Sequence, residues 1–140
     1  MSKILVFLSD NQEYSVDISY VKEIRNWTKS TIVPNSPDFL EGIINIRGSV
    51  IPLINFSKKN NSTSNNNQKK AIIVFEVDNK TISFSVDDVL EILPYHKEDL
   101  RPINFNESHI FLEGIISLEE RNIFKIKEKS FVVGCINEQQ

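Results

Sequence analysis

The side chains of this chain that could do chemistry are few and lie far apart. The two histidines, His96 and His109, stand in polar stretches that are typical of loops. Cys135 is the single cysteine, which excludes an internal disulfide and a cysteine-based zinc site. Its apolar neighbours indicate a buried structural thiol. Because no histidine-rich spacing offers a set of metal ligands, we expect neither a metal centre nor another cofactor.

The carboxylates and glycines also lack the spacing that catalysis or phosphate binding requires. Asp87-Asp88 and Glu119-Glu120 are adjacent pairs, and neighbouring side chains on a strand point to opposite faces of its sheet. No phosphate-loop motif and no G-x-S-x-G elbow occur among the four glycines, which are Gly42, Gly48, Gly114 and Gly134. The sequence therefore predicts a binding protein rather than an enzyme.

Arg47 is the side chain best placed for recognition. Two apolar runs, residues 43–46 and 50–54, flank Arg47-Gly48-Ser49, which predicts a strand, a tight turn at the glycine and a second strand. A guanidinium beside that turn could project toward a carboxylate on another molecule. On the residues alone, an internal salt bridge or an ordinary exposed charge is the simpler interpretation.

The strands that must position Arg47 belong to an internal repeat. Phe39-Leu40-Glu41-Gly42-Ile43-Ile44 recurs 72 positions later as Phe111-Leu112-Glu113-Gly114-Ile115-Ile116. At an offset of 68, residues 4–7 match residues 72–75, and residues 21–24 match residues 89–92. We therefore expect two related halves, over residues 3–57 and 70–136, each with about five strands.

A polar segment, residues 58–69, separates the halves. It is rich in Asn and Ser, which favour turns over packed structure, so it is predicted to be a flexible linker. The lysines at its ends are expected to be solvated; they are Lys58, Lys59, Lys69 and Lys70.

Short strands, frequent turn signals and the lack of a long helical period predict an all-β pair of small barrels. A barrel of about 60 residues is marginally stable alone, so the two should share apolar surface. Helix is expected only as single turns near residues 18–21, 36–39 and 98–101, and no amphipathic helix is expected at the C-terminus.

The composition suits a soluble globular protein, with 40% hydrophobic and 25% charged residues. A net charge of −3 without an obvious basic face makes nucleic acid an unsuitable partner. The N-terminus lacks the features of a signal peptide, and no apolar stretch is long enough to cross a bilayer. We expect a cytoplasmic protein that does not insert into the membrane.

One motif resembles a known family. Gly42-x-x-Asn45-x-Arg47-Gly48-x-x-x-Pro52, preceded by Val21-x-Glu23-Ile24, is similar to the CheW-like domain of bacterial chemotaxis, over nearly the whole chain. The resemblance implies two intertwined five-stranded SH3-like barrels. It also implies a scaffold without chemistry of its own, which couples the cytoplasmic tip of methyl-accepting chemoreceptors to the regulatory domain of the histidine kinase CheA. Such a protein is recruited to membrane-associated receptor arrays, where weak self-association is possible.

The resemblance also implies two binding surfaces. A receptor-binding groove at the junction of the barrels would include Val21, Glu23, Ile44, Arg47 and Ile72. A kinase-binding surface would include Arg101, Pro102 and Phe105. Val21 and Ile44 also fit a simpler interpretation as core residues, and the recurrence of Glu23 as Glu91 favours a structural role for both.

Three glycines, Gly42, Gly48 and Gly114, are predicted to be structural turn residues. The chain departs from the family pattern at Asn55, where an aspartate is usual, at Ser57, where an arginine is common, and in the charged stretch 123–127. These departures leave the choice of receptor and kinase open. The alternatives are a CheW-like adaptor of another histidine-kinase pathway, such as surface motility, and an unrelated small β-barrel binding module. A barrel that binds single-stranded nucleic acid would need a basic groove with stacking aromatic residues.

Overall fold

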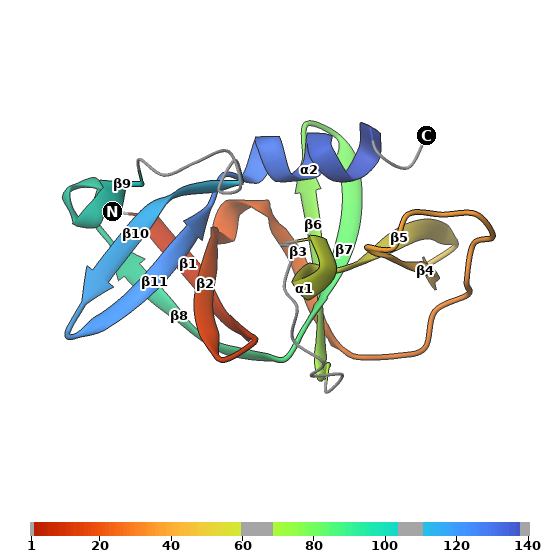
Figure 1. Cartoon of the computed structure of the whole chain (residues 1–140), viewed down its shortest axis with the longest axis horizontal. Helices are drawn as coiled ribbons and strands as arrows, with labels where there is room; N and C mark the ends of the chain where they lie inside the picture. Colours follow the sequence, from red (N-terminus) through yellow and green to blue (C-terminus); the bar gives the residue numbers. More distant parts are fainter. Residues whose placement is uncertain (1, 60–68, 104–110, 138–140) are drawn as a thin grey trace.

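Runs rich in Val, Ile and Phe form the strands of this protein, because branched and aromatic side chains pack well on a pleated surface. The computed structural model describes residues 2–59, 69–103 and 111–137 (Figure 1). One sheet has six strands in the order β8-β1-β2-β11-β10-β9, and the other has five in the order β3-β6-β7-β5-β4. The predicted all-β pair of barrels is confirmed.

The six-stranded sheet consists of β1 (Ser2–Ser9), β2 (Gln12–Asp17), β8 (Asp88–Tyr95), β9 (Leu100–Pro102), β10 (Leu112–Leu118) and β11 (Arg121–Ile126). The five-stranded sheet consists of β3 (Val21–Asn26), β4 (Leu40–Ile46), β5 (Ser49–Asn55), β6 (Ala71–Val77) and β7 (Lys80–Val86). The helical elements are α1 (Phe56–Lys59), α2 (Glu128–Asn137) and the 3-10 turns η1 (Ile18–Tyr20) and η2 (Lys97–Asp99).

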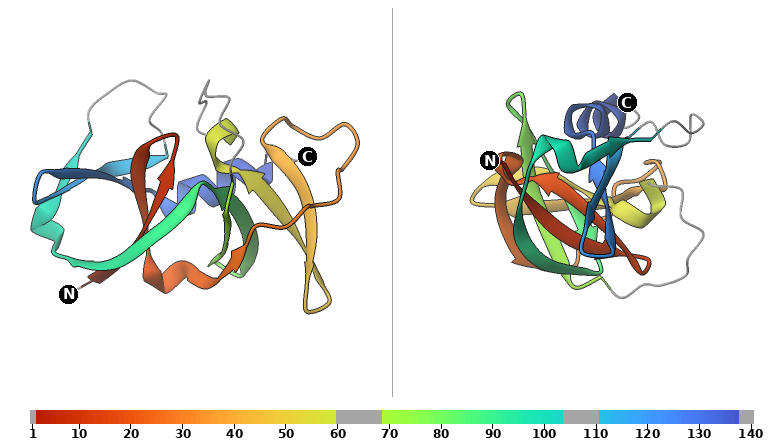
Figure 2. Two further views of the ribbon diagram at one scale, coloured as in Figure 1. Left: turned by 90° about the horizontal axis from the view of Figure 1, so that it is seen from below. Right: turned by 90° about the vertical axis from the view of Figure 1, so that its left-hand side faces the viewer.

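The two barrels are intertwined because each half of the sequence lends its first hairpin to the other half. Hairpin β1–β2 joins β8–β11, and hairpin β6–β7 joins β3–β5, as Figure 1 shows by colour. In each barrel the exchanged hairpin joins its host sheet through one parallel strand pair, β2 with β11 and β7 with β5. In the left view of Figure 2 the β4–β5 hairpin lies at one end of the molecule and the β10–β11 hairpin at the other. Each barrel therefore takes strands from both halves of the repeat.

Three apolar clusters follow from this exchange. One fills the five-stranded barrel and includes Ile44, Ile72 and Val74. Another fills the six-stranded barrel and includes Ile4 and Val6, the repeat equivalents of Ile72 and Val74. The third and largest lies between the sheets and takes side chains from both of them. The barrels thus share apolar surface, as expected for units too small to be stable alone.

The repeated Phe-Leu-Glu-Gly-Ile-Ile block marks a β-bulge in each barrel. The strand register shifts between Leu40 and Gly42, and again between Leu112 and Gly114. A Cβ on Gly42 would lie 2.5 Å from the carbonyl oxygen of Thr31, and one on Gly114 would lie 2.3 Å from that of Arg101. The prediction of turns at Gly42 and Gly114 is therefore wrong: both lie inside strands, where a neighbouring backbone passes too close for a side chain.

Gly48 does lie in a turn, at a φ of +84°, after Arg47 at +49°. The equivalent turn of the second half uses Glu119 and Glu120, at +49° and +74°. Both residues of a two-residue hairpin turn of this kind need a positive φ, whatever their type. The second half therefore keeps the turn geometry without a glycine.

The helix content differs from expectation at the C-terminus. Two of the three expected helical turns lie close to η1 and η2, whereas residues 36–39 form no helix. Helix α2, where no amphipathic helix was expected, spans ten residues and buries Phe131, Val132 and Cys135. The buried stripe is short, and the exposed position 133 is also apolar, so the helical period is weak in the sequence.

Two of the lysines at the ends of segment 58–69 are not solvated, which corrects the expectation for them. Lys59 is 6% exposed, and its ammonium lies 4.3 Å from the centre of the Phe39 ring and 5.0 Å from that of Phe111. Lys69 forms an ion pair with Asp87 at 3.0 Å. Lys58 and Lys70 are exposed, as expected. Residues 60–68, the rest of the predicted linker, lie outside the described residues.

Candidate functional site

A groove of about 470 Å³ opens on the five-stranded barrel. Its buried lining is apolar and comes from Ile46, Ile51 and Val74. Its more exposed lining is mixed and comes from Lys22, Glu23, Arg47, Ser49, Val50 and Thr81. An apolar floor with a charged rim can hold an amphipathic partner, because the floor removes apolar surface from water and the rim fixes orientation.

The charged rim is dominated by one ion pair. The two terminal nitrogens of Arg47 donate to the two carboxylate oxygens of Glu23, at 2.9 and 3.0 Å. Arg47 follows β4 and Glu23 lies on β3, so the pair joins the two edge strands of the sheet and closes the barrel. The side chain of Arg47 is nevertheless 74% exposed. It combines an internal salt bridge with an accessible guanidinium.

This hydrogen bonding changes the titration of both groups. The bonds from Arg47 lower the pKa of the Glu23 carboxyl below its ordinary value. The same bonds raise the pKa of the Arg47 guanidinium. Both groups are therefore ionised at neutral pH, and the pair keeps one positive and one negative charge.

The other predicted receptor-binding residues lie below or beside this groove. Ile44 and Ile72 are 7% and 0% exposed and pack in the core of the five-stranded barrel. Val21 is partly buried at the start of β3 and packs against the central cluster. The structure therefore brings Glu23 and Arg47 together at a surface and places the three apolar residues behind it.

The groove lies on the five-stranded barrel, to which all of its lining residues belong. The family resemblance placed a receptor-binding groove at the junction of the barrels, and receptor binding at either place stays a prediction. Sequence reasoning missed its floor residues Ile46, Ile51 and Val74. Ile46 and Ile51 flank the predicted hairpin turn, and Val74 lies two residues after Ile72 on the same face of β6. Strand periodicity around Arg47 and Ile72 was the signal that could have identified them.

The predicted kinase-binding residues lie on the other barrel. Arg101 and Pro102 are exposed on β9, an edge strand of the six-stranded sheet. Figure 1 shows β9 at the end of the molecule opposite to β4 and β5. Phe105 lies outside the described residues. The two predicted surfaces thus lie on different barrels, toward opposite ends of the molecule.

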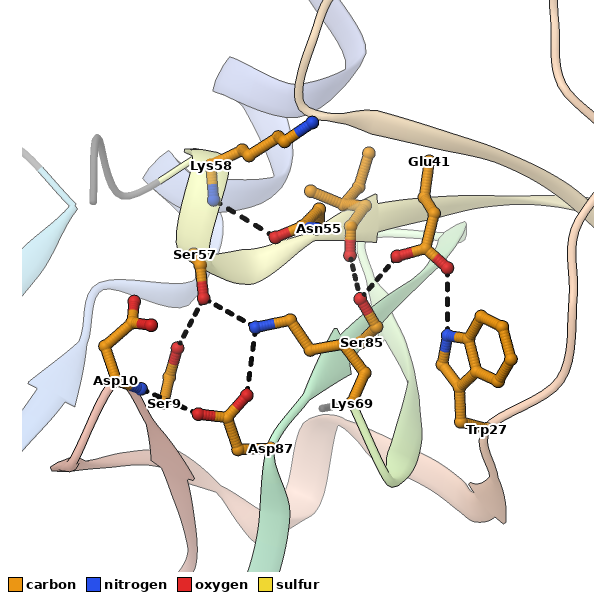
Figure 3. Close-up of polar contacts among 11 residues, drawn as sticks. Ser9, Asp10, Trp27, Glu41, Asn55, Ser57, Lys58, Lys69, Ser85 and Asp87 are labelled. Carbon is orange, nitrogen blue, oxygen red and sulfur yellow. Dashed lines mark hydrogen bonds and ion pairs between the residues drawn. The ribbon is translucent and has the colours of Figure 1, made fainter. Parts of the chain in front are cut away.

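Asn55 and Ser57, where the chain departs from the family pattern, have structural partners (Figure 3). The side-chain oxygen of Asn55 accepts a hydrogen bond of 3.1 Å from the backbone N–H of Lys58, which caps the start of α1. Buried Ser57 shares a hydrogen bond of 3.0 Å with Ser9 and accepts one of 2.6 Å from Lys69. These contacts account for both residues within the fold.

The described residues offer little to a metal or a membrane. Within residues 2–59, 69–103 and 111–137, no group of three or more His, Cys, Asp or Glu side chains could hold a metal ion. His96 is exposed, and His109 lies outside these ranges. Cys135 is fully buried, as predicted. The helices of the described chain are too short or too polar to span a bilayer.

Comparison with known proteins assigns the family. The model of the CheW-like domain matches residues 3–131. The chain belongs to the CheW-like domain family. The chemotaxis protein CheW of Rhizobium meliloti is 32% identical over 125 residues, which are 86% of this chain and 81% of that protein. The chemotaxis protein CheW of Klebsiella aerogenes is 33% identical over 128 residues, or 89% and 77% of the two chains.

A solved member of the family shares the fold. The crystal structure of the scaffolding protein TtCheW from Thermoanaerobacter tengcongensis superposes with a TM-score of 0.82 at 31% sequence identity. The match covers 90% of this chain and 88% of that chain. The predicted architecture of intertwined SH3-like barrels is therefore that of the CheW-like family.

Proposed function

We propose that this protein is a chemotaxis scaffold that couples the cytoplasmic tip of methyl-accepting chemoreceptors to the histidine kinase CheA. Membership of the CheW-like family supports this role, as do relatives named as chemotaxis proteins and a structural neighbour titled a scaffolding protein. The observation that carries the proposal is the exposed guanidinium of Arg47 at the rim of an apolar groove.

The groove on the five-stranded barrel is the proposed receptor site. A receptor tip is a helical hairpin, and a helix binds a groove of this kind through its apolar face. Val50, which is 62% exposed, adds apolar surface at the rim beside Arg47. Glu23 and Arg47 would fix the register of the bound helix, while Ile44 and Ile72 support the groove floor from inside the barrel.

The exposed edge at β9 is the proposed kinase site. Arg101 and Pro102 are exposed there, and an edge strand leaves backbone groups available for pairing with another domain. The two sites lie on different barrels, so one molecule could hold both partners. In this role the protein would be recruited from the cytoplasm to receptor arrays and would act by binding alone.

Reversal of one charge on each barrel tests this assignment. We expect Arg47→Glu to weaken binding of a receptor-tip fragment about tenfold, because the rim would present two adjacent carboxylates in place of a neutral pair. Binding of the CheA regulatory domain should be unchanged. Isothermal titration calorimetry with the purified full-length chain would measure both affinities.

Arg101→Glu is the matched control, because it reverses an exposed arginine on the other barrel. It should weaken CheA binding and leave receptor binding unchanged. Arg47→Gln repeats the first test without introducing a second carboxylate, and circular dichroism would show that each variant is folded. Undiminished receptor affinity in folded Arg47→Glu and Arg47→Gln variants would contradict the receptor-site assignment.

A further inference from the structure

We infer that helix α2 is a clasp that fixes the two barrels relative to each other. The groove lies on one barrel and β9 on the other, so the clasp also sets the distance and angle between these two surfaces. The inference concerns the conformation of the chain and does not depend on the identity of its partners. It rests on the way in which α2 is attached to both sheets.

The first turn of α2 is attached to the six-stranded barrel through a buried carboxylate. Glu128 accepts a hydrogen bond of 2.8 Å from the backbone N–H of Asp17, the last residue of β2. It also forms an ion pair with Lys125 of β11, whose side chain is only 3% exposed. The Lys125 ammonium donates further to the carbonyl of Ile126 at 3.0 Å. A buried charge pair of this kind is costly to break, because each partner alone would lack its hydrogen bonds.

The apolar face of α2 packs toward the five-stranded barrel. The ring of Phe131 lies 5.7 Å from that of Phe84 on β7 and 5.8 Å from that of Phe56 in α1. Val132 and Cys135 are buried in the central cluster, which takes side chains from both sheets. Figure 1 shows α2 running along one side of the molecule, from the end of β11 to β6 and β7.

The helix therefore bridges the two barrels with a different type of contact at each end. Its polar anchor is on the six-stranded sheet, and its aromatic contact is with the five-stranded side. Release of α2 would expose Phe131 and one face of Phe84 and of Phe56 to water, and it would remove one wall of the shared cluster. The barrels would then keep their own cores, the exchanged hairpins and the rest of the shared cluster, but their relative angle would be less restricted.

A pair of neighbouring valines provides a matched test. Val132 is 1% exposed and Val133 is 46% exposed on the same helix. The substitutions Val132→Ala and Val133→Ala change helix propensity equally, so they differ only in the packing that they remove. Cys135 is fully buried and is the single cysteine of the chain, so the rate at which a thiol reagent labels it reports on detachment of α2.

We expect Val132→Ala to label about tenfold faster than the wild type, and Val133→Ala to label at the wild-type rate. At low denaturant concentration the faster labelling should be independent of denaturant, since local opening exposes little surface. Residual dipolar couplings report the dominant conformation, so they need a variant in which α2 is detached in most molecules. The double variant Phe131→Ala/Val132→Ala removes the two largest buried side chains of α2 and should need a separate alignment tensor for each sheet. Wild type and Val133→Ala should fit one tensor for both sheets.

Three results would overturn the inference. The first is equal labelling of the two variants, because the buried face of α2 would then not hold the helix. The second is labelling of Val132→Ala that rises with denaturant in parallel with global unfolding, because α2 would then not be separable from the rest of the fold. The third is a Phe131→Ala/Val132→Ala variant whose Cys135 labels as fast as a fully accessible thiol while its dipolar couplings still fit one tensor, because the barrels would then keep their orientation without the helix.

Discussion

The five-stranded and six-stranded barrels both carry a glutamate–arginine pair between an edge strand and a hairpin. In the first, Arg47 in the turn binds Glu23 of β3. In the second, Arg121 at the start of β11 binds Glu91 of β8, the repeat equivalent of Glu23, at 2.9 Å. The arginine has moved by two positions between the copies, yet it reaches the same glutamate.

The two guanidiniums differ in what else they contact. Arg121 also forms an ion pair with Glu13 of β2, and its side chain is 33% exposed. The hydrogen bond to Glu13 is the main reason why the pKa of Arg121 is raised. The repeat equivalent of Glu13 is Thr81, which lines the groove beside Arg47. Arg47 has no second carboxylate at that position and is 74% exposed.

The comparison shows how a structural salt bridge can leave its guanidinium accessible, as the proposed receptor site requires. A salt bridge that closes a barrel edge needs only one carboxylate and leaves the remaining donors of the guanidinium accessible. A second carboxylate uses those donors and covers the side chain. One copy has Glu13 at this position and the other has Thr81. This difference distinguishes an arginine that is covered by two carboxylates from one that stays accessible to a partner.

The largest effect should come from the cores, where the two barrels are expected to be equivalent. Ile72→Ala and Ile4→Ala each remove a fully buried side chain at matched positions of the repeat. We expect each to lower the free energy of unfolding by about 3 kcal/mol, measured by urea titration. A large loss in one variant and a negligible loss in the other would show that the barrels are not packed alike.

An intermediate effect is expected when the five-stranded barrel is given the second carboxylate that the six-stranded barrel has. Thr81→Glu should place a carboxylate beside Arg47 and weaken binding of a receptor-tip fragment about tenfold, because the guanidinium would be occupied as Arg121 is. Thr81→Gln, of similar size but uncharged, is the control and should bind as the wild type does. Equal affinity of wild type and Thr81→Glu for the receptor-tip fragment would show that the receptor does not use the free donors of Arg47.

The smallest effect is expected from pH at the exposed pair. The pKa of Glu23 is lowered from its ordinary value of 4.5 by hydrogen bonding to Arg47. The pair therefore contributes stability above that value and loses it as the pH falls through the lowered pKa. Urea titrations at pH 7 and pH 3 should show a small difference between wild type and Glu23→Gln that is reduced at the lower pH. A difference that is equal or larger at pH 3 would contradict this assignment.

Local features of the candidate site were predictable from the sequence, but its depth and position were not. The Arg47-Gly48 turn and the recurrence of Glu23 as Glu91 were visible as residue types and spacings. The full burial of Ile72 and the location of the groove on one barrel depend on how β6 crosses into the other half. The same crossing makes Val74, which shares a face of β6 with Ile72, a floor residue of the groove.

Burial of charge was the feature least accessible to sequence reasoning. Lys59 lies between Phe39 and Phe111, which are the same position of the repeat in its two copies. Lys69 pairs with Asp87, 18 positions further along the chain. A lysine in a polar segment is normally solvated, and only a partner brought from elsewhere in the chain makes burial favourable.

The sequence by itself determined the strands, the hairpin turns, the duplication and the family, because these depend on dihedral preference, apolar period and short motifs. Tertiary structure alone decided which hairpin joins which barrel, which lysines are buried and where α2 docks. Each of those outcomes depends on contacts between residues far apart in the chain. A local sequence pattern does not determine the free energy of such contacts.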